Sequence, residues 1–270
     1  EARPPQESLD ESLDHRRYDV PIDAGDVEEI IQACYTQSAD AGGRVLHVIP
    51  RNYAVDGYWG VGNPVGMHGS TLEVESHVVH GDPAPIDNIV EAFRRSGVRV
   101  KGLVLEPLAS AEAVLTHEVR EMGVMMADIG GGTSDMSVFL DGNIWHSGVV
   151  PVGGFQFTRD ISIAFTTPFQ AAEMAKLKYG NALPDGIDTQ ENIWLPGFGD
   201  ETLYQVSRQR LCQVLHERVE ELLQIVMMQL HESGLERLPP GGLVLTGGAA
   251  KLPGLEEMAR SVFSGPIRIG

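Results

Sequence analysis

The sequence predicts a protein of the α/β class, in which a small α+β unit precedes a larger part built around glycine-rich turns. Three observations carry this prediction. Residues 72–79 alternate so that one face is mostly apolar, which is typical of a half-buried strand. Two glycine-rich turns, within 128–135 and within 244–255, each follow a short apolar run of strand character. Residues 202–232 place apolar side chains at helical spacing over a long stretch.

The small unit is expected to end near residue 105. Residues 1–19 are polar, contain a proline pair and show no apolar periodicity, so we expect a linker or a frayed start there. The remaining elements follow from periodicity and from turn residues. They are a helix at 27–39, strands at 44–50, within 52–60 and at 70–81, an amphipathic helix at 86–97 and a strand at 98–106.

The second part begins with an alanine-rich, apolar helix at 107–119, which we expect to pack between layers. Strands at 124–128 and 134–140 flank the first glycine turn, and a hairpin at 141–143 leads to a third strand. Helices near 156–165 and 168–179, a loop-rich segment at 180–200, the long helix and a final strand, turn and helix complete the expected order. Because the chain opens without Met and stops within an apparent strand, we expect a fragment of a longer protein; the alternative is a natural short protein.

Composition excludes several classes of function. The 270 residues include 20 Lys and Arg against 38 Asp and Glu, a formal charge of −18 that disfavours nucleic acids and anionic lipid surfaces as partners. Cys34 and Cys212 fit no metal or redox spacing and are expected to be buried thiols of a cytosolic protein. No apolar run is long enough to span a bilayer, and no signal peptide opens the chain.

The segment "DIGGGTSD" at 128–135 predicts a phosphate site. Three glycines between two strands let backbone N–H groups converge on an anion, and Thr133 adds a hydroxyl donor. Asp128 is placed to hold Mg²⁺ through water, and Asp135 either does the same or braces the turn. A plain hairpin turn is the alternative, and the P-loop pattern is absent.

Three weaker signals follow along the chain. Gly247 and Gly248 end a strand, where ligands of open α/β sheets usually bind, although ordinary strand-to-helix punctuation explains them equally well. The pair at 153–154 carries little weight alone. Glu173 and Lys176 share a helical face, either as a solvated ion pair or as groups for a ribose and a base.

Taken together and in this order, these segments resemble the actin/Hsp70/sugar-kinase ATPase superfamily. "DIGGGTSD" is similar to its second phosphate motif, "EMAK" to its ribose- and adenine-contacting helix, and "LTGGAAKLPGL" to its adenosine motif. "HVIPRNYAVDG", "NPVGMHGSTLEVESHVV", "VLEPLASAEAVL" and the segment 150–180 narrow the resemblance to the FtsA family of bacterial cell-division proteins, over about residues 15–265.

This resemblance implies half of an actin-like ATPase fold, of the ribonuclease H-like type, with an inserted SHS2-like α+β domain called 1C. Its implied bounds are 20–105 for domain 1C, 106–121 for a connecting helix, 122–155 and 238–270 for domain 2A, and 156–237 for domain 2B. It also implies that ATP and Mg²⁺ are the cofactors. The residues that it assigns to the nucleotide are Asp128, Gly130, Gly131, Gly132, Thr133, Gly153, Gly154, Glu173, Lys176, Gly247, Gly248 and Ala249, with Asp128 near the metal.

The function implied is that of an adaptor which binds ATP, polymerises into actin-like filaments and links the FtsZ ring to the cytoplasmic membrane. The C-terminal tail of FtsZ is expected on domain 2B, and filament contacts and later division proteins on domain 1C. No catalytic base can be named, and ATP hydrolysis is expected to be slow. The alternatives are a PilM-like pilus-assembly actin homologue, a sugar or acetate kinase and an Hsp70-like chaperone; the "NPVGM" and "EPLASAEAVL" strings favour FtsA over PilM.

Two departures from the family pattern shape these expectations. Family members begin with domain 1A and its first phosphate loop, and they end with an amphipathic membrane-targeting helix; neither pattern occurs in this sequence. We therefore expect this chain to carry the second of the family's two phosphate-binding loops, at 128–135, without the first. The complete protein is expected in the cytoplasm, held by that helix on the inner face of the membrane at the division site.

Overall fold

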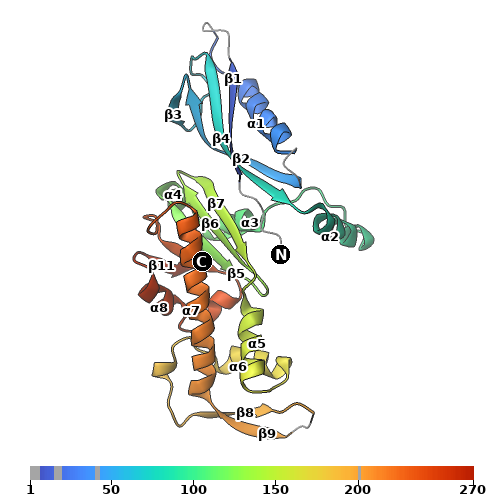
Figure 1. The fold of residues 1–270 in the computed structure, drawn as a ribbon, viewed down its shortest axis with the longest axis vertical. Coiled ribbons are helices and arrows are strands. Elements are labelled where there is room, and N and C mark those ends of the chain that lie inside the picture. Colours follow the sequence, from blue (N-terminus) through green and yellow to red (C-terminus); the bar gives the residue numbers. More distant parts are fainter. Residues whose placement is uncertain (1–6, 15–19, 40–42, 200–201) are drawn as a thin grey trace. The chain divides into compact units, whose positions relative to one another are not determined.

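The computed structural model describes residues 7–14, 20–39, 43–199 and 202–270, which form two compact units (Figure 1). The first unit comprises Glu1–Ala109 and Asn143–His146, and the second comprises Ser110–Gly142 and Ser147–Gly270. Each unit is described by itself. In the described parts of the chain, no helix has both the length and the apolar character needed to cross a bilayer.

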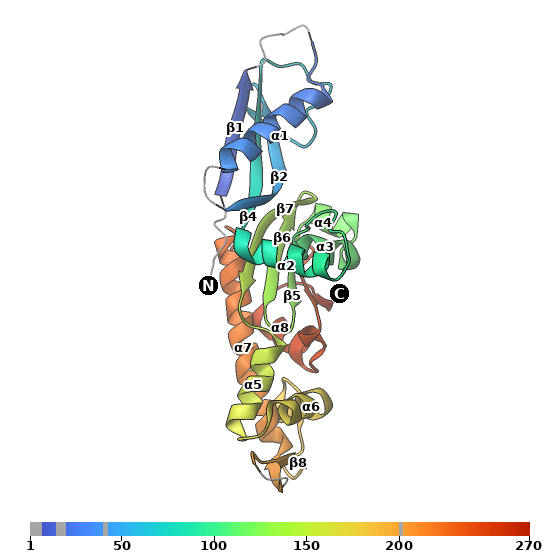
Figure 2. The ribbon, with the colours of Figure 1, turned by 90° about the vertical axis from the view of Figure 1, so that its right-hand side faces the viewer.

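The first unit is built on a four-stranded antiparallel sheet in the order β1-β4-β2-β3. Its strands are β1 (Glu7–Asp14), β2 (Arg44–Val55), β3 (Tyr58–Val61) and β4 (Thr71–Gly81). Helix α1 (Ala24–Ala39) covers one face, where Ile30 and Cys34 are buried together with Leu72 and Val74 of β4 (Figure 2). The alternation predicted for residues 72–79 is confirmed as far as Ser76, because Leu72, Val74 and Ser76 are buried and Glu73 and Glu75 are less so; beyond Ser76 it fails, since His77 and Val79 are buried as well as Val78.

Two predictions for this part of the chain are wrong. The expected linker at 1–19 contains strand β1, which pairs with β4 along its whole length; residues 1–6 and 15–19 lie outside the described residues. Helix α2 (Pro83–Arg95) is present, and Asp82 caps it by accepting from the Ala84 amide. The strand expected at 98–106 is absent, because no described strand pairs with this segment, and Val98 and Val104 are exposed.

The second unit contains a mixed five-stranded sheet in the order β11-β10-β5-β6-β7. Its strands are β5 (Val124–Ile129), β6 (Ser134–Leu140), β7 (Asn143–Val150), β10 (Leu243–Thr246) and β11 (Ile267–Ile269). Strand β10 runs parallel to β5 and β11, whereas β5 and β6 form the predicted antiparallel pair. Five of the six residues of β5 are buried, since helices cover the sheet around it.

The helices that accompany this sheet are α3 (Glu106–Val114), α4 (His117–Met122), α7 (Arg208–Glu232) and α8 (Leu255–Val262). The single helix expected at 107–119 is divided into two. Helix α3 ends at Val114, and Thr116 caps α4 by accepting from the Val119 amide. The long helix begins at Arg208 rather than near 202. Strand β9 (Leu203–Ser207) precedes it, and the Ser207 hydroxyl accepts from the Arg210 amide as its cap.

Helices α5 (Gly154–Ala164) and α6 (Phe169–Tyr179) lie beyond one end of the five-stranded sheet, close to where residues 156–165 and 168–179 were expected to be helical. Strands β8 (Asn192–Pro196) and β9 form a hairpin in the segment predicted to be rich in loops. Helix α7 runs from this hairpin to the sheet and contacts α5 on the way (Figures 1 and 2). Helix α5 therefore lies between the five-stranded sheet and the β8–β9 hairpin.

Candidate functional site

A cavity of about 410 Å³ opens in the second unit where the glycine turns of the sheet meet α5 and α6. Its walls come from four segments that are distant in sequence. The lining residues are Gly130, Gly131, Gly154, Phe155, Phe157, Phe169, Glu173, Lys176, Leu177, Gly248, Ala249, Lys251, Leu252 and Pro253.

The first wall is the turn between β5 and β6. The Gly130 amide donates to the Thr133 carbonyl at 2.9 Å, which closes the turn. Within the described residues, the amides of Gly131, Gly132 and Thr133 have no hydrogen-bond partner, and all three residues are exposed. A Cβ added to Gly131 or Gly132 would meet no atom within 4 Å. The turn therefore presents three available N–H donors to open space, which is the geometry of an anion site.

The start of α5 holds this turn from behind. The Gly154 amide donates to the Gly130 carbonyl at 2.9 Å, and the Phe155 amide donates to the Gly131 carbonyl at 2.6 Å. A Cβ at Gly153 would lie 2.8 and 2.9 Å from the same two carbonyl oxygens, so the approach depends on glycine. The amides of 154 and 155 are thus used within the protein, and they direct the carbonyls of the turn away from the cavity.

The second glycine turn lies against the first. Gly247 has a positive φ of 88°, and a Cβ there would lie 2.4 Å from Asp128 Oδ1 and 2.5 Å from the Ile129 carbonyl. The neighbouring Gly248 is exposed, and a Cβ there would meet no atom within 4 Å. Gly248 and Ala249 of this turn line the cavity, followed along the chain by Lys251, Leu252 and Pro253, while Gly247 permits the close packing of the two turns.

Glu173 and Lys176 of α6 form an ion pair at the cavity wall, with Lys176 Nζ 2.7 Å from Glu173 Oε2. The ammonium group also donates to the Gly154 carbonyl at 3.0 Å and to Thr158 Oγ1 at 2.9 Å. Its three donors are therefore directed at protein groups, and only 13% of the Lys176 side chain is exposed. This pair is therefore part of a partly buried network that joins α6 to α5.

The carboxylate of Glu173 is held ionised in this network. Burial opposes ionisation, but hydrogen bonds from Lys176 and Thr158 and the charge of Lys176 outweigh it, so the pKa of Glu173 lies below its ordinary value. Thr158 is fully buried on α5 and contacts Oε2 of Glu173. Within the described residues Oε1 has no hydrogen-bond partner, so this oxygen is available to a hydroxyl group in the cavity.

The two aspartates of the first turn have different surroundings. Asp128 is half-buried, and its Oδ2 accepts from Ser110 Oγ of α3 at 2.5 Å. Asp135 is 5% exposed and accepts from Thr133 Oγ1 at 3.3 Å, so it braces the turn. Among the described residues, no group of three His, Cys, Asp or Glu side chains could hold a metal ion. Asp128 alone still fits a cation bound through water beside an anionic ligand, because Mg²⁺ needs only one or two carboxylates there.

The structure brings seven of the predicted site residues to the cavity: Gly130, Gly131, Gly154, Glu173, Lys176, Gly248 and Ala249. The others, which are Asp128, Gly132, Thr133, Asp135, Gly153 and Gly247, belong to the same turns without lining it. Sequence reasoning missed the apolar wall. Phe155 and Phe169 pack with ring centroids 4.5 Å apart at 33°, next to Leu177. The aromatic residue that directly follows Gly153 and Gly154 was the available signal.

The chain matches two family models. The model described as "Cell division protein FtsA" matches residues 125–270, and the model described as "SHS2 domain inserted in FTSA" matches residues 10–80. Cell division protein FtsA of Pseudomonas aeruginosa is 40% identical over 252 residues, which cover 93% of this chain and 60% of that protein. The protein of that name from Escherichia coli K12 is 39% identical, over 91% of this chain and 60% of its own length. The chain therefore spans about 60% of the length of these relatives.

Solved structures show the same fold at low identity. The structure titled MreB5 of Spiroplasma citri bound to ADP has a TM-score of 0.58 and 18% identity, and the match covers 70% of this chain and 61% of that one. The PilM-PilN type IV pilus biogenesis complex has a TM-score of 0.61 and 17% identity, and the match covers 97% of this chain and 66% of that one. The expected actin-like α/β fold with an SHS2 domain is thereby confirmed.

Proposed function

Because this chain belongs to the FtsA family of cell-division proteins, we propose that its cavity binds ATP with Mg²⁺ and that the protein couples the FtsZ ring to the cytoplasmic membrane. One observation carries the nucleotide part of the proposal. Gly131 and Glu173 line one cavity with an apolar wall, and the exposed amides of residues 132–133 and the half-buried carboxylate of Asp128 belong to the glycine turn that forms its first wall.

Each part of the cavity suits one part of the nucleotide. The amides of 131–133 would donate to phosphate oxygens, and Asp128 would hold Mg²⁺, which neutralises phosphate charge. Glu173 Oε1 would accept from a ribose hydroxyl. The base would lie on the apolar wall near Phe155 and Leu177, against the turn at Gly248. The ADP named for the MreB5 structure supports a nucleotide in this fold.

Substituting Gly131 tests the nucleotide site. Gly131→Val adds a branched side chain beside the available amides, and its Cβ meets no protein atom within 4 Å. We expect ATP binding to be lost in equilibrium dialysis of the full-length gene product, while the fold is retained. Gly186→Val is the matched control, because Gly186 is also an exposed glycine with no atom near an added Cβ. Unchanged ATP affinity in Gly131→Val would refute the site.

The FtsZ-binding part of the proposal concerns residues 156–237, the region assigned above to domain 2B. The β8–β9 hairpin in this region exposes Trp194, Phe198 and Leu203, by 60%, 61% and 56%. Exposed aromatic and aliphatic residues that lie together are typical of a peptide-docking surface. We further propose that the protein polymerises through contacts between copies and recruits later division proteins through the SHS2 domain, on the inner face of the membrane at the division site.

Titration with an FtsZ C-terminal tail peptide tests the adaptor role. We expect binding by the full-length gene product, and we expect Trp194→Ala to weaken it about tenfold or more, as for an aromatic anchor. Trp59→Ala, which removes an exposed tryptophan from the SHS2 domain, is the control and should leave the affinity unchanged. If the unaltered protein fails to bind the peptide, the adaptor role is wrong even where ATP binds.

A further inference from the structure

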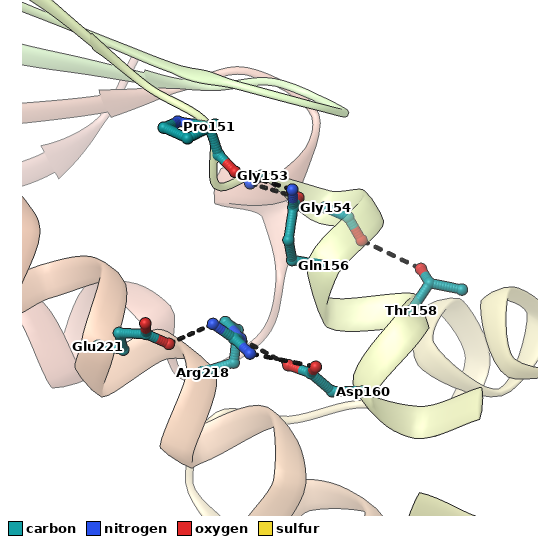
Figure 3. A network of polar contacts seen from close by, with 8 residues as sticks. All are labelled: Pro151, Gly153, Gly154, Gln156, Thr158, Asp160, Arg218 and Glu221. Carbon is teal, nitrogen blue, oxygen red and sulfur yellow. Dashed lines mark hydrogen bonds and ion pairs between the residues drawn. The ribbon is translucent and has the colours of Figure 1, made fainter. Parts of the chain in front are cut away.

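A polar network joins α5 to α7 (Figure 3). Arg218 of α7 donates from Nε to Asp160 Oδ2 at 2.5 Å and from Nη2 to Asp160 Oδ1 at 3.1 Å. The third guanidinium nitrogen, Nη1, donates to Glu221, which lies one turn further along α7. Only 25% of the Arg218 side chain and 23% of the Asp160 side chain are exposed. Two parallel bonds of this kind fix orientation as well as distance.

Asp160 lies one helical turn after Gln156 on α5, and Gln156 holds the loop that leads into this helix. The Gln156 amide group accepts from the Gly153 amide at 2.9 Å and donates to the Pro151 carbonyl at 2.8 Å. The first two amides of α5 in turn hold the carbonyls of Gly130 and Gly131. Figure 3 shows two groups of contacts, one from Glu221 and Arg218 to Asp160 and one from Gln156 to Gly153 and Pro151, and the backbone of α5 connects Asp160 to Gln156.

We propose that Arg218 and Asp160 are positioning residues for the nucleotide site: their ion pair fixes α5 on α7 and thereby fixes the orientation of the amides at 131–133. Helix α5 is 11 residues long and moves as one body, so a change at Asp160 shifts its first turn as well. That first turn is bonded directly to the phosphate-facing turn. Neither residue lines the cavity.

This inference rests on the proposed nucleotide site, but part of its test does not. Arg218→Gln and Asp160→Asn remove the charges with little change in shape. In both variants, hydrogen exchange at the amides of Gly154 and Phe155 is expected to accelerate without any nucleotide present, because their bonds to the glycine turn loosen. ATP affinity by equilibrium dialysis of the full-length gene product is expected to fall about 2- to 30-fold. Arg218→Lys, which keeps the charge and one bond, should recover most of it.

Arg208→Gln is the matched control. Arg208 also lies on α7, is 25% exposed, and donates to both oxygens of Glu191 at 2.9 and 2.7 Å and to the Tyr179 carbonyl at the end of α6 at 3.0 Å; neither partner belongs to α5. Removing this pair should lower stability to a similar degree and change neither exchange at 154–155 nor ATP affinity.

Equal effects of Arg218→Gln and Arg208→Gln on both measurements would overturn the proposal, because the ion pair would then contribute only general stability. No acceleration at Gly154 and Phe155 would overturn it as well. If the unaltered protein binds no ATP while exchange responds as expected, the proposed nucleotide function fails and the mechanical link between α7 and the glycine turn stands.

Discussion

Replacing Lys176 by Met tests whether the cavity wall is held together by the three donors of this ammonium group. The substitution keeps the length and the apolar stem of the side chain. It removes the ion pair to Glu173 at 2.7 Å and the bonds to Gly154 and Thr158 at 3.0 and 2.9 Å. Glu173 is left without its cation, and α6 loses the two bonds from Lys176 to α5, whereas the contact between Thr158 and Glu173 remains.

The cost can be bounded from the geometry. A hydrogen bond that involves a charged group contributes about 1.5–3 kcal/mol. Two features reduce the total loss below a simple sum. Glu173 is 36% exposed and can be rehydrated, and the Gly154 carbonyl still accepts from Thr158 Oγ1 at 3.0 Å. We therefore expect about 2 kcal/mol of destabilisation, which corresponds to a fall in Tm of about 4–8 °C for a unit of this size.

The assay is differential scanning calorimetry at pH 7, with Lys178→Met as the control on the same helix, because Lys178 is exposed. The effect should also depend on pH with a definite sign. The pKa of Glu173 is depressed, so the ion pair contributes fully above the ordinary value of 4.5 and is lost as the pH falls through the lower folded value. The reasoning is refuted if Lys176→Met lowers Tm no more than Lys178→Met does.

Two further predictions concern positions away from this ion pair. Gly153→Ala should destabilise the protein by about 1–3 kcal/mol, because an added Cβ lies 2.9 Å from the Gly131 carbonyl oxygen. Gly248→Ala should change stability by less than about 1 kcal/mol, because its added Cβ lies in open space. Thermal unfolding of both variants measures this difference. In an NMR titration, His77 should remain neutral from pH 7 to pH 4, because burial and the charges of Arg51 and His146 lower its pKa from 6.5 to about 3. The unfolded chain binds that proton first, so stability should decline as the pH falls below 6.5, and a His77 midpoint near 6 would contradict this.

The parts of the site that were predictable from the sequence are those that depend on glycine. Two strand-like segments joined by three glycines can form few structures other than a tight turn between two strands. The turn at 130–132 and its flanking strands were therefore predicted to within about one residue. Gly247 and Gly248 were located for the same reason. Their separate roles were not visible, because only the packing against Asp128 distinguishes the glycine that permits contact from the one that faces the cavity.

The two errors in the first unit share one physical cause, which is that strand formation depends on a partner. Residues 7–14 alternate too weakly to be recognised, yet they form β1 because β4 offers an unpaired edge. Residues 98–106 have the composition of a strand, yet among the described residues no strand pairs with them. Local propensity is a weak guide in both cases, since the hydrogen bonds that decide the outcome come from segments far along the chain.

The ion pair of α6 shows how a correct observation can still leave the role of a residue undetermined. The spacing of Glu173 and Lys176 indicated that they share a helical face, and this is what the structure has. Spacing within one helix could not show that Gly154 and Thr158 of α5 take the other two donors of Lys176. In the described residues the three donors of Lys176 go to protein groups, so we predict that Lys176 affects nucleotide binding through the contact between α5 and α6 and that its substitution lowers the affinity for every nucleotide base alike.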